Sequence, residues 1–374
     1  MLDDISLRRD FPSLDGLAYL NTAAESVPPL VVHEAVGEYM RDKALGMRGR
    51  DGHFAAVERC REVSARMVGM LAAEVSFCSC SSEAYNLLAS ALDLGGEDEV
   101  VVSDLDFPAG TTPWQRMSCP PVMRVWGSVD GELRVPDLER LLGKGTRLVQ
   151  VSLVSFYNGH RLAWRRFVEA VRALAPEAVI AVDVTQALGR LALDCEGADI
   201  VISSTHKWTL GIHGGCVVGG PEGGSERLTT RAGGWYHVTN AFDGDRFERA
   251  VSKAGAASFS VGMPNFISLY ALDAALRYVD AVGVDRISEH ADPLVAKVDE
   301  GLRGLGIIPL CRWSAENPSG IVAFRHERSE RMASALREAG IEVMHHAGRI
   351  RVAVHGYNRA GDVDRLLGVI AGLV

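Results

Sequence analysis

Two short apolar segments constrain the fold of this chain most strongly. Residues 178–184 and residues 198–203 are rich in β-branched side chains, and each pattern predicts a buried strand. Asp183 lies where the first segment ends, and residues 204–207, Ser-Thr-His-Lys, follow the second. In an open α/β sheet, ligands bind beyond the carboxyl ends of the parallel strands. The sequence therefore predicts that these polar groups meet at one crevice.

Lys207 and Asp183 have the chemistry that pyridoxal phosphate requires. Partial burial at a strand end lowers the pKa of a lysine ammonium group and makes the amine a nucleophile toward a carbonyl group. A carboxylate one strand away could keep a pyridine nitrogen protonated, while Ser204 and His206 could bind a phosphate group. Considered singly, Asp183 could cap a helix and Lys207 could be a surface charge.

The two motifs together resemble the cofactor signature of a known enzyme family. Asp183-Val-Thr-Gln186 and Ser204-Thr-His-Lys207 are similar to the motifs of class V aminotransferase-fold enzymes. That group includes cysteine desulfurases, selenocysteine lyases, kynureninases and isopenicillin N epimerase-like proteins. The resemblance implies pyridoxal 5'-phosphate as cofactor, a Schiff base at Lys207, and Lys207 and Asp183 as the catalytic pair.

The same resemblance implies an α/β fold, fold type I of the pyridoxal phosphate enzymes. Its large domain has a mostly parallel seven-stranded sheet flanked by helices, and a smaller C-terminal α+β domain follows. We expect residues 17–275 to form the large domain and residues 276–374 the small one. The N-terminal segment, residues 1–16, is expected to pack with the small domain.

Further cofactor contacts follow from the resemblance and from local pattern. Ser81 and Ser82 begin an expected helix, whose backbone N–H groups would bind phosphate, although the two serines could be ordinary caps. Phe107 stands where many relatives have histidine, so it could stack on the cofactor ring without relaying a proton, or it could belong to the core. Gln186 is expected to bond the ring hydroxyl, and Ser204 and His206 to contact the phosphate.

Two residues are expected on the substrate side. Arg351 lies in a segment that matches the family's C-terminal strand, whose arginine binds the substrate α-carboxylate through its guanidinium fork. A surface position on the strand is the alternative for Arg351. Asn21 lies in a phrase that resembles the family's entry segment, although it could be a simple turn residue.

Some positions depart from the family pattern. Met263 replaces a threonine that, in relatives, reaches the phosphate of the partner subunit, so that contact is either lost or made by Ser260. A homodimer with active sites near the interface is still expected. Residues 340–349 contain no cysteine, whereas cysteine desulfurases have a nucleophilic cysteine there, so persulfide formation is not expected.

Several reactions remain compatible with these residues. Transamination is the first choice because the family is rich in it, and β-elimination of the C–S lyase type or epimerisation are the alternatives. A degenerate binding protein of the same fold is the non-enzyme alternative. No Gly-x-Gly-x-x-Gly motif follows an early strand, which argues against a dinucleotide-binding enzyme.

The composition of the chain excludes several classes of binding partner. The net charge is −9 and no basic run interleaves with aromatic residues, which argues against nucleic acid. No apolar run approaches the roughly 20 residues needed to cross a bilayer, so we expect no membrane contact and a cytoplasmic location. The seven cysteines are irregularly spaced, which predicts reduced thiols and no metal site. The family resemblance implies a small-molecule amino-acid substrate as the partner.

Overall fold

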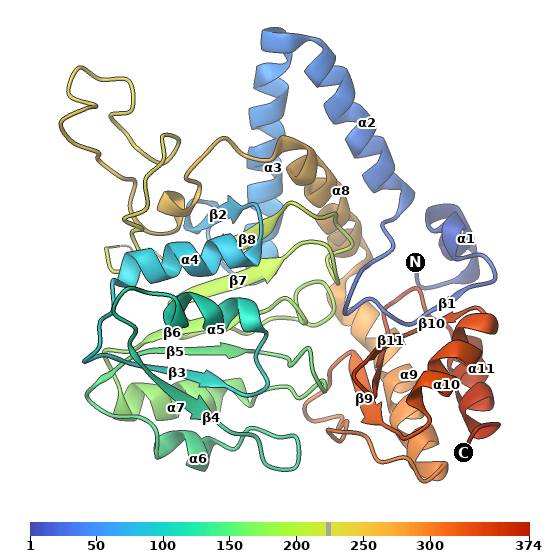
Figure 1. Ribbon diagram of the computed structural model, residues 1–374. Coiled ribbons are helices and arrows are strands. Elements are labelled where there is room, and N and C mark those ends of the chain that lie inside the picture. Colours follow the sequence, from blue (N-terminus) through green and yellow to red (C-terminus); the bar gives the residue numbers. More distant parts are fainter. Residues whose placement is uncertain (222–225) are drawn as a thin grey trace.

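A seven-stranded, mostly parallel sheet forms the centre of the molecule (Figure 1). The computed structural model describes residues 1–221 and 226–374. The strand order is β2-β8-β7-β6-β5-β3-β4, and β8 alone runs antiparallel to its neighbours. The strands are Val75–Cys78 (β2), Glu99–Ser103 (β3), Val122–Trp126 (β4), Thr146–Ser152 (β5), Val179–Asp183 (β6), Ile200–Ser204 (β7) and Cys216–Gly219 (β8).

Helices cover both faces of this sheet, which explains why its central strands β6 and β7 are buried and apolar along most of their length. Val100 and Val102 of β3 pack toward one face, and Val101 packs toward the other. The first face is covered by Ser81–Leu92 (α4) and Pro108–Gln115 (α5). The second is covered by Arg50–Val68 (α3), Val135–Glu139 (α6), Trp164–Leu174 (α7) and Phe266–Val282 (α8).

The C-terminal part of the chain forms a smaller α+β unit with its own core. An antiparallel sheet of order β11-β12-β9 packs against three helices. The strands are Ile321–Arg325 (β9), Met344–His346 (β11) and Arg349–Ala353 (β12), and the helices are Val284–Gly304 (α9), Ser329–Glu338 (α10) and Ala360–Ala371 (α11). The parallel sheet and this separate unit confirm the predicted fold class.

The N-terminal segment bridges the two parts of the molecule. Helix α1 (Asp4–Asp10) accepts a 3.1 Å bond from Arg359 at the start of α11, and Tyr278 of α8 donates to Asp10 at 2.7 Å. Strand β1 (Ala18–Tyr19) then pairs in parallel with β10 (Ile341–Glu342) of the small domain. Helix α8 continues through residue 275, and the two predicted boundaries, after residues 16 and 275, stay predictions.

The layout places one edge of the large sheet beside the small domain. Figure 1 shows the arrowheads of β3, β5 and β7 pointing toward the part of the chain that holds β9 and β11. Helix α2 (Leu30–Ala44) and helix α3 project together away from the sheet. Among the described residues, no helix combines the length and the apolar character that crossing a membrane requires.

Candidate active site

Asp183 ends β6 at the carboxyl edge of the sheet, and its carboxylate is held from two sides. The Tyr85 hydroxyl donates to Oδ2 at 2.9 Å, and the backbone N–H of Thr185 donates to Oδ1 at 2.8 Å. Burial, followed by the nearby Asp183 carboxylate, raises the pKa of Tyr85 well above its usual range, so Tyr85 remains a donor. The carboxylate is therefore oriented by groups of the large domain.

Lys207 lies in the turn that follows β7. The backbone N–H of Ser26 donates to the His206 carbonyl at 3.0 Å, and Leu210 adopts a left-handed conformation with φ of 60°. A left-handed leucine costs about 1–2 kcal/mol, so packing must impose this turn. Burial lowers the pKa of Lys207 to about 8; Asp183 opposes that shift and Arg351 adds to it. The amine is thus closer to its reactive neutral form at neutral pH.

Two serine hydroxyls meet where α4 begins. Ser204 Oγ donates to Ser81 Oγ at 3.1 Å, and Ser81 is the first residue of α4. Ser82 is exposed, and its carbonyl accepts a bond from Asn86. A helix N-terminus with adjacent hydroxyls can bind an anion, so this corner has the groups that a phosphate requires.

His206 is neutral in this setting. Burial, and then Lys207 and His213, lower its pKa to about 4. Its ring stacks on the ring of His213 with centroids 4.1 Å apart. The expected phosphate contact of His206, if made, would therefore come from a neutral imidazole.

Phe107 presents its ring to the site and does not belong to the core. It is 45% exposed, and the Lys207 amine lies 5.5 Å from the ring centroid. The preceding residue fixes its position: the buried Asp106 carboxylate accepts 2.7 Å bonds from the backbone N–H groups of Ser103 and Ser152. The alternative that Phe107 fills the core is thus wrong, because the β3 end turns it outward.

Gln186 is already bonded within the large domain. Its Oε1 accepts a 2.6 Å bond from Trp208 Nε1, and its Nε2 donates to the Ala23 carbonyl at 3.1 Å. One N–H of the amide is left over after these two contacts. A bond from Gln186 to the ring hydroxyl stays a prediction.

Arg351 and Asn21, the two residues predicted to bind substrate, each have one buried polar atom without a partner among the described residues. Arg351 is only 3% exposed, so the alternative of a strand-surface arginine is wrong. Its Nη1 donates to the Phe156 carbonyl at 2.8 Å, while Nε has no partner among the described residues. Asn21 Oδ1 is likewise buried and unbonded within the described chain, next to Ala353 of β12. Buried polar atoms without partners are rare and mark positions where a ligand can bond.

Comparison with known proteins places these residues in a family. The model of the family "Aminotransferase class-V" matches residues 18–366, which is nearly the whole chain. The chain belongs to the class-V aminotransferase family. This confirms the family that the two motifs predict.

Relatives within this family have several functions. The chain is 28% identical to an uncharacterized aminotransferase, YcbU, of Bacillus subtilis, over 97% of this chain and 96% of that protein. It is 27% identical to a probable cysteine desulfurase of Pyrococcus abyssi, over 98% and 97% of the two chains. The enzyme class is thus shared across full-length relatives, while the reactions in their names differ.

Solved structures share the fold. The apo cysteine desulfurase of Thermococcus onnurineus superposes with a TM-score of 0.88 at 24% identity, covering 100% of this chain and 98% of the other. A C-DES variant with glycine linked covalently to its pyridoxal phosphate gives a TM-score of 0.88 at 20% identity, covering 97% and 98%. At these identities the likeness establishes the fold.

Several residues that shape this class-V site were not among the sequence-based candidates. Tyr85 follows Ser81 by one helical turn, so helical spacing could have placed it beside the site. Trp208 and Arg349 carry no comparable signal, because their partners Gln186 and Tyr157 lie 22 and 192 residues away in sequence. Asp106 has one local partner, Ser103, and one distant partner, Ser152. Ser260 is bonded within its own chain, to Ser76 Oγ at 2.7 Å and to the Phe77 carbonyl at 3.0 Å.

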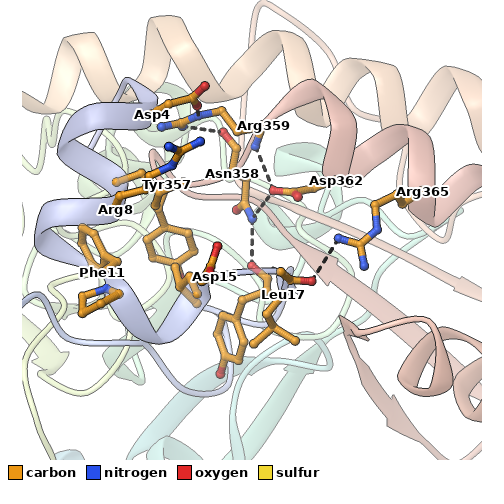
Figure 2. A pocket seen from close by; sticks show the side chains of 15 residues that line it. Asp4, Arg8, Phe11, Asp15, Leu17, Tyr357, Asn358, Arg359, Asp362 and Arg365 are labelled. Atoms are coloured by element: carbon orange, nitrogen blue, oxygen red, sulfur yellow. Dashed lines mark hydrogen bonds and ion pairs between the residues drawn. The ribbon is translucent and has the colours of Figure 1, made fainter.

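A cavity lined by the N-terminal segment lies outside this site. It has a volume of about 530 Å³ and opens between α1 and the start of α11 (Figure 2). Its wall contains Phe11, Tyr357 and Arg359 and none of the predicted site residues. This cavity is therefore separate from the polar groups that the sequence predicts at the strand ends.

Proposed function

We propose that the chain is a pyridoxal phosphate-dependent aminotransferase that acts at Cα of an amino acid. The residues fit the cofactor. Asp183 offers an anion for a ring nitrogen, the Ser81–Ser204 corner offers donors for a phosphate, and Phe107 offers an exposed aromatic face. When bound, pyridoxal phosphate supplies an aldehyde that joins amines and a ring that accepts electrons from Cα.

Each residue then has a defined task. Lys207 would hold the aldehyde carbon of the cofactor until the substrate amine displaces it, and its freed amine would then take the proton from substrate Cα and return it to the aldehyde carbon. Its pKa of about 8 leaves a useful neutral fraction near pH 7. Arg351 would bind the α-carboxylate, and Asn21 would bond a polar group beside it.

One observation supports transamination over a two-base epimerisation, and product analysis separates it from β-elimination: Lys207 is the one amine that faces the exposed ring of Phe107 among the described residues. A single base on one side can move a proton between two carbons that are bonded to the same nitrogen, here substrate Cα and the aldehyde carbon of the cofactor. Epimerisation needs a second proton donor on the opposite side, and a phenyl ring cannot supply one. Persulfide formation needs a thiol, and residues 340–349 contain none.

Product analysis tests the proposal. Holoenzyme is incubated with alanine, glutamate or cysteine, and the 2-oxo acid, ammonia and the visible spectrum of the cofactor are followed. Equal amounts of 2-oxo acid and aminated cofactor without ammonia support transfer. Pyruvate with ammonia from cysteine would establish β-elimination instead, and an unchanged spectrum with every amino acid would favour the binding protein.

We also propose a cytoplasmic homodimer. Its support is the exposure of large apolar side chains where α2 meets α3 and in the segment before α8. Met47, Phe242 and Phe247 are 76%, 82% and 88% exposed, and such patches are typical of interaction surfaces. Sedimentation of the purified protein at one-chain mass would overturn the dimer.

A further inference from the structure

Strand β12 carries two buried arginines on one face. Arg349 and Arg351 are 4% and 3% exposed, and they are two residues apart, so their side chains leave the same side of the strand. Both reach the turn after β5. Arg349 Nη1 donates to the Tyr157 carbonyl, and Arg351 Nη1 donates to the Phe156 carbonyl.

Neither guanidinium has an anionic partner. Within residues 1–221 and 226–374, no carboxylate lies at ion-pair distance from Arg349 or Arg351. The fully buried Arg190 shows the usual arrangement, because it pairs with Asp292 at 2.6 Å. The chain therefore neutralises one buried arginine and leaves two others uncompensated.

The two charges also repel each other. Burial, followed by the proximity of Arg349, lowers the pKa of Arg351 to about 10. Arg325, opposite Arg349 on β9, adds a third positive charge. Burying an unpaired charge lowers the stability of the folded state, and burying two unpaired like charges side by side lowers it further. Such an arrangement is expected where anions bind from outside the chain.

A continuous aromatic wall links this pair to the cofactor side. Phe107 contacts Phe156 edge-to-face with centroids 5.0 Å apart. The Arg349 guanidinium carbon lies 5.8 Å from the centroid of Phe156 and 4.1 Å from that of Tyr157. Arg351 is close enough to Lys207 to depress its pKa. The aromatic wall therefore runs from Phe107, beside the Lys207 amine, to the guanidinium group of Arg349.

We infer that the site selects amino acids with two carboxylates, the α-carboxylate at Arg351 and a side-chain carboxylate at Arg349. The inference rests on the proposed function for the α-carboxylate position. Guanidinium groups bind carboxylates through two parallel hydrogen bonds, and Arg349 keeps its Nε and Nη2 atoms without a protein partner among the described residues. Aspartate and glutamate have the required chemistry. The rival role for Arg349 is to hold the turn at Tyr157 and nothing more.

Binding of unreactive acids separates these roles. Titration calorimetry on the holoenzyme compares glutarate with pentanoate, which has the same five-carbon chain but one carboxylate fewer. The native protein is expected to bind glutarate at least about tenfold more tightly, equal to about 1.4 kcal/mol. Arg349→Met is expected to reduce the preference to within about twofold, while Arg349→Lys, which keeps a charge, retains part of it.

The matched control is Arg325→Met. Arg325 donates to the Ala347 carbonyl at 2.7 Å and to the Tyr157 hydroxyl at 3.0 Å, so its loss disturbs the same turn without removing Arg349. This variant is expected to keep the glutarate preference. Equal binding of the two acids by native protein, or an unchanged preference in Arg349→Met, would overturn the inference.

The proposed function can fail separately. If the holoenzyme transfers no amino group from any amino acid, transamination is wrong, and calorimetry with glutarate still decides the role of Arg349. If Arg349→Met does not fold, as judged by circular dichroism, the Arg349→Lys and native measurements carry the decision. Glutamate should also show a lower KM than alanine in the native enzyme.

Discussion

The two sides of the active site differ in how their charges are compensated. On the large-domain side, the Asp183 carboxylate has two hydrogen-bond donors and lies near the Lys207 amine. On the small-domain side, Arg349 and Arg351 have carbonyl partners and no carboxylate within the described chain. The charged groups on the large-domain side have partners within the described chain, whereas the two arginines on the small-domain side would gain anionic partners only when ligands bind. The following predictions test that contrast.

The largest effect is expected at Lys207. Lys207→Ala removes both the covalent attachment point and the base, so amino-group transfer should fall by at least about 10³-fold. Mass spectrometry after borohydride reduction should show no attached cofactor. Exposed Lys43→Ala is the control and should retain both signals. A rate of amino-group transfer in Lys207→Ala within tenfold of the native rate would contradict the proposed role of Lys207.

Asp183→Asn preserves shape and removes the charge on the large-domain side. Turnover should fall by about 10²–10³-fold, because a preorganised charge at the reacting group is lost. Steady-state rates at saturating amino acid measure this. Tyr85→Phe removes only one donor to the same carboxylate and should cost less than about tenfold. Equal losses in both variants would show that orientation, and not charge, is what matters.

Charge removal should affect stability differently at two buried arginines. Arg190→Met leaves Asp292 unpaired and should lower the free energy of unfolding by about 3 kcal/mol. Arg351→Met removes an uncompensated charge and loses one hydrogen bond, so the free energy of unfolding should stay within about 1 kcal/mol of native. Urea denaturation measures both. A large loss in Arg351→Met would mean that the small-domain side is compensated after all.

A smaller effect is expected from pH. The Lys207 amine reacts when neutral, and its pKa is about 8, so cofactor attachment to the apoprotein should quicken about fivefold between pH 7 and pH 8 and level off above that. Arg351→Met removes a positive charge that lowers this pKa, so the profile should move to higher pH. Stopped-flow absorbance follows attachment. A rate still climbing at pH 10, as for an exposed lysine, would refute the burial of Lys207.

Much of the fold and part of the site were predictable because their signals are local. Apolar runs ended by polar residues predict parallel strands with ligands at their carboxyl ends, and Asp183, Ser204 and Lys207 lie there. The sequence left two alternative positions open for Phe107 and for Arg351. A phenylalanine after a strand looks the same whether it is packed or 45% exposed. The structure decides because the Asp106 bonds turn that segment outward.

The contacts that orient the site join residues far apart along the chain. Tyr85 donates a hydrogen bond to Asp183 from 98 residues away, and Trp208 donates one to Gln186 from 22 residues away. Neither pairing can be predicted from the sequence separation of the two partners. Arg349 is similar. Its sequence neighbours predict a strand, and only the packing of β12 against the turn after β5 buries it beside a second arginine.

The amino-acid sequence by itself determined the layered α/β fold, the family and the amine–carboxylate pair, because periodicity and strand-end residues are properties of short segments. Only the tertiary structure decided which polar groups are neutralised and which await a ligand. Charge compensation depends on distances between elements that fold together from opposite parts of the chain. The bonded Asp183 and the unpaired Arg349 and Arg351 are the two outcomes of that folding.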